Sequence, residues 1–468
     1  MVRLDVRFPL LAAMLLCPLF MLGQDTRTVV EPTVPAVCAT LRAQLAAPGG
    51  ALAETDEGKP DTARIQSAID KCGAGKAVEL RPVGKNNAFL SGPLELRPGV
   101  TLLVDADATL FGSRNPRDYD RTPGSCGLVD KNGAGCKPLI FAVKAPGSAI
   151  MGNGAIDARG GAKLLGQNVT WWELADQARA GGKQNCPRLL QIEHSNNFTL
   201  YGITLRNSPN FHVVVAKTDG FTAWGMKIDT PRSARNTDGI DPSGSTNLTI
   251  THSYIRTGDD HIAVKAGGAG ATTHMTVAHN HFYSGHGMSI GSEVNSGVSG
   301  IRVSDLTIDG ADDGLRIKSD ASRGGLVHDI SYENVCIRDT REPIVIDPFY
   351  AKDVTGDLIP AFQDIRLKNV RISGGTKVTL VGYDTQHPLK IAFDGVVAEG
   401  IKPEDIKTTH AQITNGPGLV TLAPKGKDVQ LKQVPGKGKE VSKCGDRFVP
   451  YPEGPAIPKL QTASAGIP

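Results

Sequence analysis

The sequence predicts an all-β fold, a single-stranded right-handed parallel β-helix in which short strands wind into stacked coils. The first observation is spacing: polar clusters recur along the chain, and 21, 27 and 30 residues separate Asp238, Asp259, His286 and Arg316. The second is the frame around each cluster, where apolar and polar residues alternate as in half-buried strands. Repeats of this length are typical of solenoids and are too short for a strand–helix–strand unit in each. An antiparallel sandwich with coincidental spacing is the alternative.

Residues 1–23 have the layout of a secretory signal. Two arginines precede an apolar run from Phe8 to Leu22, which ends at the small residue Gly23. Two prolines interrupt this run, and it is short for a membrane span. We therefore expect a secreted protein, extracellular or periplasmic, that has no membrane attachment after signal cleavage. A membrane anchor is the alternative.

Residues 24–76 form an N-terminal segment with a short helix. Asp61 or Thr62 can cap a helix that runs to Asp70, in which Ile65 and Ile69 share one apolar face. A helix at the start of a solenoid would cover its open apolar end, as terminal repeats require.

The repetitive body is predicted over residues 77–397, as a catalytic domain. Residues 398–468 contain Lys- and Pro-rich stretches and are expected to form a loose C-terminal cap or tail. The 54 glycines and 30 prolines suit a fold with many turns. A net charge of only +3 argues against nucleic acid as the main partner, and we expect a monomer.

Seven cysteines remain after the expected signal, an odd number that leaves at least one thiol without a partner in the chain. Export permits disulfides. Cys126 and Cys136 flank a Gly-rich loop and are the first candidates for a bridge, and Cys38 with Cys72 are the second. The chain has no Cys-x-x-Cys pair, which argues against a cysteine zinc site.

The polar clusters would form one column on the β-helix, because neighbouring strands lie roughly 4.8 Å apart. Asp238, Asp259 and Asp260 would then be too close to ionise independently, and one of them should keep its proton to a higher pH than a free aspartate. A protonated acid beside ionised ones is what glycoside hydrolysis needs. Arg316 and Lys318 project from one strand face and would suit an anionic sugar. A purely structural ion network of these residues is the alternative.

The chain resembles the polygalacturonases of glycoside hydrolase family 28. The four motifs of that family stand complete and in order, as Asn236-Thr-Asp238, Gly258-Asp-Asp260, Gly285-His-Gly287 and Arg316-Ile-Lys318. Further matches extend over most of the mature chain, and Ile344–Tyr350 is similar to the segment that supplies the family's active-site tyrosine.

This resemblance implies inverting hydrolysis of α-1,4-galacturonan, the backbone of pectin, without a metal or another cofactor. By motif, Asp259 matches the general acid, while Asp238 and Asp260 match the pair that activates water. His286 would tune the protonation of the acid. The motifs also imply a set of substrate-binding residues, which comprises Asn236, Arg316, Lys318 and Tyr350.

Two other classes of protein remain open at this stage. A pectate lyase shares the β-helix and the anionic polymer, but it needs calcium bound by acids and an arginine base. A β-helical protein that only binds polysaccharide would explain the coils but not the alignment of acids and cations.

Overall fold

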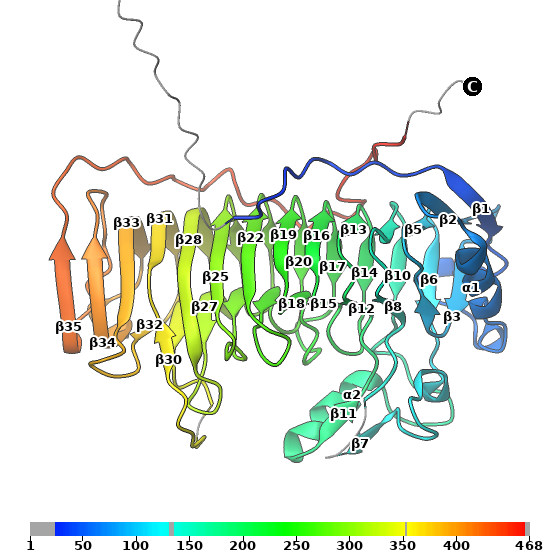
Figure 1. Cartoon of the computed structure of the whole chain (residues 1–468), viewed down its shortest axis with the longest axis horizontal. Coiled ribbons are helices and arrows are strands. Elements are labelled where there is room, and N and C mark those ends of the chain that lie inside the picture. The colour runs from blue at the N-terminus through cyan, green and yellow to red at the C-terminus, as the bar shows by residue number, and fades with distance from the viewer. Residues whose placement is uncertain (1–23, 131–134, 352, 464–468) are drawn as a thin grey trace, which may run out of the picture.

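The computed structural model describes residues 24–130, 135–351 and 353–463, which wind into one parallel β-helix (Figure 1). Its ladders join 33 strands into one continuous sheet. The predicted fold class is therefore confirmed. The predicted signal at residues 1–23 lies outside the described residues.

Each coil contributes strands to as many as three longitudinal ladders. The first ladder contains β4 (Leu94–Glu95), β8 (Ile140–Val143), β12 (Leu190–Glu193), β15 (Val213–Ala216), β18 (Ile240–Ser243), β21 (Ile262–Val264), β24 (Met288–Ile290), β27 (Asp313–Lys318), β29 (Glu342–Asp347) and β32 (Val378–Val381). The second contains β1 (Val37–Arg42), β2 (Lys76–Arg81), β5 (Val100–Val104), β9 (Ala149–Met151), β13 (Phe198–Tyr201), β16 (Asp219–Trp224), β19 (Thr246–Thr251), β22 (Thr272–Ala278), β25 (Val298–Ser304), β28 (Gly325–Arg338), β31 (Ile365–Ser373), β33 (Leu389–Glu399), β34 (Ile406–Asn415) and β35 (Gly426–Gln433). The third contains β3 (Ala88–Ser91), β6 (Thr109–Gly112), β10 (Ala155–Asp157), β14 (Thr204–Arg206), β17 (Lys227–Asp229), β20 (Tyr254–Arg256), β23 (His281–Phe282), β26 (Thr307–Asp309) and the second half of β28. The short strand β30 (Pro360–Phe362) pairs with the start of β28.

The core consists of apolar side chains that stack from coil to coil. In the first ladder, one register row places Ile240, Ile262, Met288, Leu315 and Ile344 on successive strands, and all five are buried. Side chains alternate between the two faces of a strand, so the neighbours of these core residues along each strand face outward. This inward row fixes which polar side chains can reach the outer face.

The predicted N-terminal helix is confirmed as α1 (Thr62–Lys71). Asp61 is its N-cap residue, although its side chain accepts from the backbone N–H of Leu90 and not from a backbone N–H of the helix. Ile65 and Ile69 are fully buried in the main core, and α1 lies at the N-terminal end of the coils (Figure 1).

An excursion made of two loops, one between β6 and β8 and one between β10 and β12, leaves the coils (Figure 1). It contains α2 (Trp171–Gln177) and the antiparallel pair of β7 (Leu128–Asp130) with β11 (Lys183–Asn185). A capping box begins α2, in which Thr170 and Glu173 satisfy each other's backbone donors. The ring of Trp171 packs edge-on against Tyr119 at 6.0 Å, which anchors α2 to the preceding loop.

The C-terminal boundary that the sequence predicts at residue 397 is wrong. The strand β33 continues to Glu399, and β34 and β35 add further parallel strands beyond it. Almost every residue of β35 is exposed, and Lys427 and Lys432 stand near its two ends. Such lysines protect the edge of a sheet from pairing with another chain, which explains why this strand looked like a solvated tail in the sequence.

After β35 the chain runs back along the coils as a strap, residues 441–462 (Figure 1). The Nζ of Lys227 donates to the carbonyl oxygens of Pro452 and Gly454, at 2.5 and 2.8 Å. Farther along, Thr462 bridges to Val34 near the N-terminus of the described chain. This segment is therefore packed against the coils and is not loose.

The described residues form three disulfides, which include both predicted bridges, Cys38–Cys72 and Cys126–Cys136. The third, Cys336–Cys444, joins β28 to the strap and was not predicted. Cys186 is the free cysteine of the described residues and is buried. Within the same described ranges, no helix combines the length and apolar character needed to cross a membrane.

Candidate active site

Three of the four catalytic candidates occupy one register row of the first ladder. Asp238, Asp260 and His286 each stand two residues before a paired core residue, namely Ile240, Ile262 and Met288. The row continues into β27, where Asp313 stands two residues before Leu315. Residues that are distant in sequence thus follow one another at the spacing of adjacent strands, roughly 4.8 Å.

The loop before β24 needs glycine on both sides of His286. Gly285 and Gly287 have φ values of 144° and 74°, and a Cβ on Gly287 would lie 2.0 Å from the carbonyl oxygen of Gly314. His261 supports this loop from below, because its Nδ1 accepts from the backbone N–H of Gly287 at 2.9 Å. Burial lowers the pKa of His261 to about 4, which keeps the ring neutral and able to accept.

Asp259 and His286 form a hydrogen-bonded pair. His286 Nδ1 lies 3.0 Å from Asp259 Oδ1, and the N–H of Asp260 donates to the same oxygen at 2.9 Å. Asn236 Nδ2 donates to the other oxygen at 3.4 Å. Burial opposes charge on both groups, but their mutual hydrogen bond and attraction outweigh it, so the pKa of Asp259 is lowered and that of His286 is raised.

Asp260 is buried among donors. It accepts from Ser289 Oγ at 2.6 Å and from Lys318 Nζ at 2.7 Å, and Arg316 Nη1 lies 3.5 Å away. Burial raises the pKa of a carboxyl group, yet Lys318 and Arg316 overcome this effect and lower the pKa of Asp260. This carboxylate is therefore ionised in the free protein near neutral pH.

Asp238 has the opposite environment. It is buried, its Oδ1 has no hydrogen-bond partner, and its nearest cation, Lys265 Nζ, lies 4.0 Å from Oδ2. Burial, followed by the charges of Asp241 and Asp259, raises its pKa well above 3.8. Among the clustered acids, Asp238 is thus the one whose surroundings most favour the protonated form.

Arg316 and Lys318 lie on β27 and face the acids, while Tyr350 closes the far side. Arg316 Nη1 is 3.2 Å from Asp313 Oδ2. The ring centre of Tyr350 lies 5.5 Å from Arg316 Cζ and 5.2 Å from Lys318 Nζ, and 43% of the residue is exposed. Both cations are thus engaged by carboxylates of the site, with the exposed tyrosine over them. The structure brings all eight predicted site residues onto neighbouring coils.

A family comparison agrees with this arrangement. Residues 72–421 match the model of "Glycosyl hydrolases family 28". The chain belongs to this family. A polygalacturonase of Ralstonia solanacearum is 46% identical over 429 residues, which cover 80% of this chain and 81% of the relative. An endo-polygalacturonase of Pectobacterium parmentieri is 46% identical over 392 residues, which cover 83% and 94% of the two chains.

The fold comparison gives the same result. A solved polygalacturonase from Erwinia carotovora ssp. carotovora superimposes with a TM-score of 0.71 at 42% identity, and the match covers 90% of this chain and all of that structure. The protein is therefore a glycoside hydrolase with the parallel β-helix of that family.

The sequence analysis of this glycoside hydrolase missed several residues that shape the site, among them Asp241, Lys265 and Ser289. Asp241 lies three residues after Asp238 and is buried, with Lys265 Nζ 3.8 Å from Oδ2. Lys265 also pairs with Glu293 at 3.6 Å, and Ser289 is the hydroxyl donor to Asp260. The strand register could have identified Asp241. It follows the core residue Ile240 directly, as Arg316 follows Leu315, so the two side chains lie on the same outer face.

The atoms of Asp259, Asp260 and His286 that could ligate a cation lie within 4.8 Å of one another. Two of these residues already have partners, however: His286 Nδ1 is hydrogen-bonded to Asp259, and Lys318 supplies a positive charge to Asp260. The three residues fit proton transfer better than they fit a divalent cation, because the ammonium group of Lys318 already occupies one of the carboxylates and would repel the cation.

A cavity of about 740 Å³ lies on the second ladder, away from the catalytic candidates. Its lining includes Arg302, Asp329, Glu333 and Arg366. It is open, and its charged side chains already form ion pairs such as Arg302 with Asp329. The row of acids on the first ladder, and not this cavity, carries the candidate chemistry.

Proposed function

We propose that this glycoside hydrolase cleaves the α-1,4-galacturonosyl linkages of polygalacturonan, the backbone of pectin, with inversion of configuration. One observation carries the proposal: the hydrogen-bonded Asp259–His286 pair and the ionised Asp260 stand beside the two cations of β27. Acid and base groups at one point can cleave a glycosidic bond, and the cations suit a uronate. The relatives that are named polygalacturonases support the choice of substrate.

Asp259 acts as the general acid. The Asp259–His286 pair holds one proton, which resides on His286 in the free protein because the pKa of His286 is raised and that of Asp259 is lowered. As the glycosidic C–O bond breaks, negative charge develops on the leaving oxygen. His286 passes this proton to the Asp259 carboxylate, and Asp259 delivers it to the leaving oxygen, which leaves His286 neutral and Asp259 ionised.

Asp260 and Asp238 act on the attacking water. Asp260 is ionised and can accept one proton of the water while the oxygen attacks the anomeric carbon from the face opposite the leaving group. Asp238 contributes once it has lost its own proton, so its raised pKa limits activity at low pH. Attack from the opposite face inverts the configuration.

Arg316, Lys318 and Tyr350 bind a galacturonate next to the bond that is cleaved. The buried Nε of Arg316 has no hydrogen-bond partner, which leaves a donor in its fork for a substrate carboxylate. The exposed ring of Tyr350 offers a face to the sugar. The same cations lower the pKa of Asp260, so they serve both binding and catalysis.

A calcium-dependent lyase fits this site less well. A lyase base must take a proton from the substrate, but Arg316 is held by Asp313 and Asp260, and its pKa is raised by these charges despite burial. A protein that only binds polysaccharide would need no pair such as Asp259–His286.

The deciding experiment incubates the purified protein with polygalacturonate, with and without a chelator. Reducing ends should appear in both samples without absorbance at 235 nm, and proton NMR should show the β-anomer first. Unsaturated product that depends on calcium would establish a lyase, and the absence of any product would leave only binding. The size of early products distinguishes exo action, which releases monomer, from endo action.

Export and a monomeric state are further parts of the proposal. Fractionating the culture tests export, and size-exclusion chromatography tests the monomeric state.

A further inference from the structure

Two arginines stand on the N-terminal side of the catalytic row and have no role in the mechanism above. Arg188 lies two residues before Leu190, which pairs with Val213, and Val213 pairs with Ile240. Arg188 is thus in the same register row as Asp238, two coils away, or roughly 10 Å. Its side chain is partly buried and lies against the ring of Phe211.

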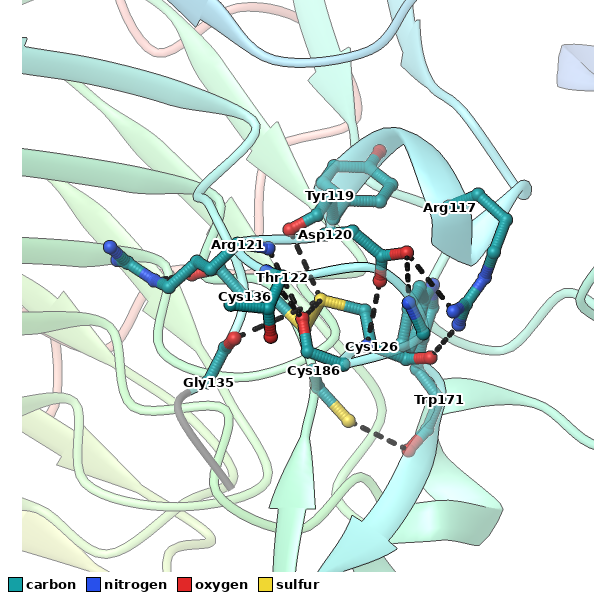
Figure 2. Close-up of a disulfide and its surroundings, with 12 residues drawn as sticks. Arg117, Tyr119, Asp120, Arg121, Thr122, Cys126, Gly135, Cys136, Trp171 and Cys186 are labelled. Carbon is teal, nitrogen blue, oxygen red and sulfur yellow. Dashed lines mark hydrogen bonds and ion pairs between the residues drawn. A yellow bond between two sulfur atoms is a disulfide. The ribbon is translucent and has the colours of Figure 1, made fainter.

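Arg121 reaches the same place from the excursion. Its Nε donates to the carbonyl oxygen of Cys136 at 3.2 Å, and the Cys126–Cys136 disulfide closes the loop that carries this carbonyl (Figure 2). Asp120 holds the loop from within, because its carboxylate accepts from the N–H of Cys126 at 2.9 Å and from that of Gly124 at 2.8 Å. Arg121 is therefore fixed through a braced and cross-linked loop.

The two guanidinium groups line one cavity of about 230 Å³, together with Gln184, Gln191 and Asn210. This cavity adjoins the catalytic site, since Gln184 Nε2 donates to the side chain of the catalytic-site residue Asn236 at 3.4 Å. Its polar lining is rich in N–H donors and holds two positive charges.

No carboxylate pairs with either arginine within residues 24–130, 135–351 and 353–463. Arg188 donates to the neutral amide of Gln191 at 2.7 Å, and Arg121 donates to a backbone carbonyl. Asp241, Asp238 and Glu193 act on Arg188 only from a distance, while burial and the neighbouring Arg121 lower its pKa. The buried Arg114, by contrast, has a direct acidic partner in Glu57. Two like charges that share a small cavity without an acid form a site for an anion.

We propose that Arg188 and Arg121 form a second carboxylate-binding subsite, which takes a further galacturonate of the polymer on the side of the catalytic acids opposite Arg316 and Lys318. This inference rests on the proposed function, and it adds the path that the polysaccharide takes along the coils. A planar guanidinium matches a carboxylate with two parallel hydrogen bonds, and Gln184 and Gln191 offer amide donors to the hydroxyl groups. The disulfide acts as a positioning element for Arg121.

The test compares Arg188→Gln and Arg121→Gln with Arg179→Gln. Arg179 is an exposed arginine of the same excursion that pairs with Asp176, so the control matches the change in charge. Steady-state kinetics are measured on polygalacturonate at low and high salt, after circular dichroism and thermal unfolding confirm the fold. We expect KM to rise roughly tenfold in each subsite variant, with a smaller change in kcat, because a charge-assisted hydrogen bond is lost. High salt should raise KM of the wild type more than KM of the variants.

Two further comparisons sharpen the test. The advantage of the wild type over Arg188→Gln should shrink on highly methyl-esterified pectin, since an ester carries no charge. Replacing Cys126 and Cys136 together by serine should raise KM as Arg121→Gln does, and should add little in the Arg121→Gln background.

The outcomes separate the subsite from the proposed function. An inactive wild type would overturn the function itself. An active wild type with KM values for Arg188→Gln and Arg121→Gln equal to that of Arg179→Gln would overturn the subsite and leave the function standing. If Arg188→Gln does not fold, the test rests on Arg121→Gln and on the comparison of pectate with esterified pectin. Equal KM values for Arg121→Gln and Arg179→Gln would again overturn the proposal.

Discussion

Asp241 should make the protein less stable as pH rises, and replacing it by asparagine should remove this loss. The carboxyl group is buried, and neither of its oxygens has a hydrogen-bond partner. Burial, which is the largest cause, raises its pKa from 3.8 to about 7, although Lys265 acts in the opposite direction. In the unfolded chain the group returns to its ordinary pKa.

The sign follows from proton binding. The folded state holds the proton more tightly than the unfolded state, so the stabilisation is complete below pH 3.8 and is lost as pH rises through about 7. The gap between these two values corresponds to about 4 kcal/mol in the free energy of unfolding. Removing Asp241 also relieves Asp238, whose pKa Asp241 raises. We therefore set the free energies of unfolding of wild type and variant equal at pH 3.5. Near pH 8 the variant should then be more stable than the wild type by about 4 kcal/mol.

Urea unfolding followed by tryptophan fluorescence from pH 3.5 to 8 measures this difference. Asp241→Asn keeps the shape of the side chain, and Lys265 retains Asp238 and Glu293 as partners. Asp357→Asn, a change at an exposed loop aspartate, is the matched control and should follow the wild type. If Asp241→Asn loses stability with pH as steeply as the wild type does, Asp241 is ionised in the folded protein, and the argument from burial is refuted.

The remaining predictions concern catalysis and the strap. Asp259→Asn should lower kcat by roughly 10²–10⁴ with little change in KM, and near-normal turnover of the folded variant would exclude it as the acid. The rate should fall as pH rises through a value above 6.5, where the raised pKa of His286 lies, and His286→Ala should move this limb in a pH–rate profile. Lys318→Met should raise KM, because the substrate carboxylate loses a cation. It should also raise the pKa of Asp260 in a carboxyl titration followed by NMR, because Asp260 loses the ammonium group that lowers it; an unchanged pKa of Asp260 would contradict the 2.7 Å pair. Replacing Cys336 and Cys444 by serine should destabilise the protein by about 2–5 kcal/mol in urea unfolding, with activity retained at 25 °C, and an unchanged midpoint would show that the strap holds without the bridge.

The sequence by itself determined the coils and the order of the catalytic candidates. Alternation with a period of two marks strands whatever their partners are, and the recurrence of Asp238, Asp259, His286 and Arg316 at intervals of 21 to 30 residues favours strands that stack. The helix α1 was also readable, because its apolar face and its start at Asp61 are local features.

Only the tertiary structure decided the partners and the electrostatics. Whether Asp260 or Asp238 holds a proton depends on Lys318 and Lys265, which come from other coils and reach the acids only through the register of the ladder. The strands β34 and β35 were read as a tail for a related reason. Their lysines look like a solvated surface until the parallel pairing with β33 shows that they line the edge of the last coils. Local pattern determines which face a side chain takes, whereas charge, burial and pKa are set by neighbours that the sequence does not place together.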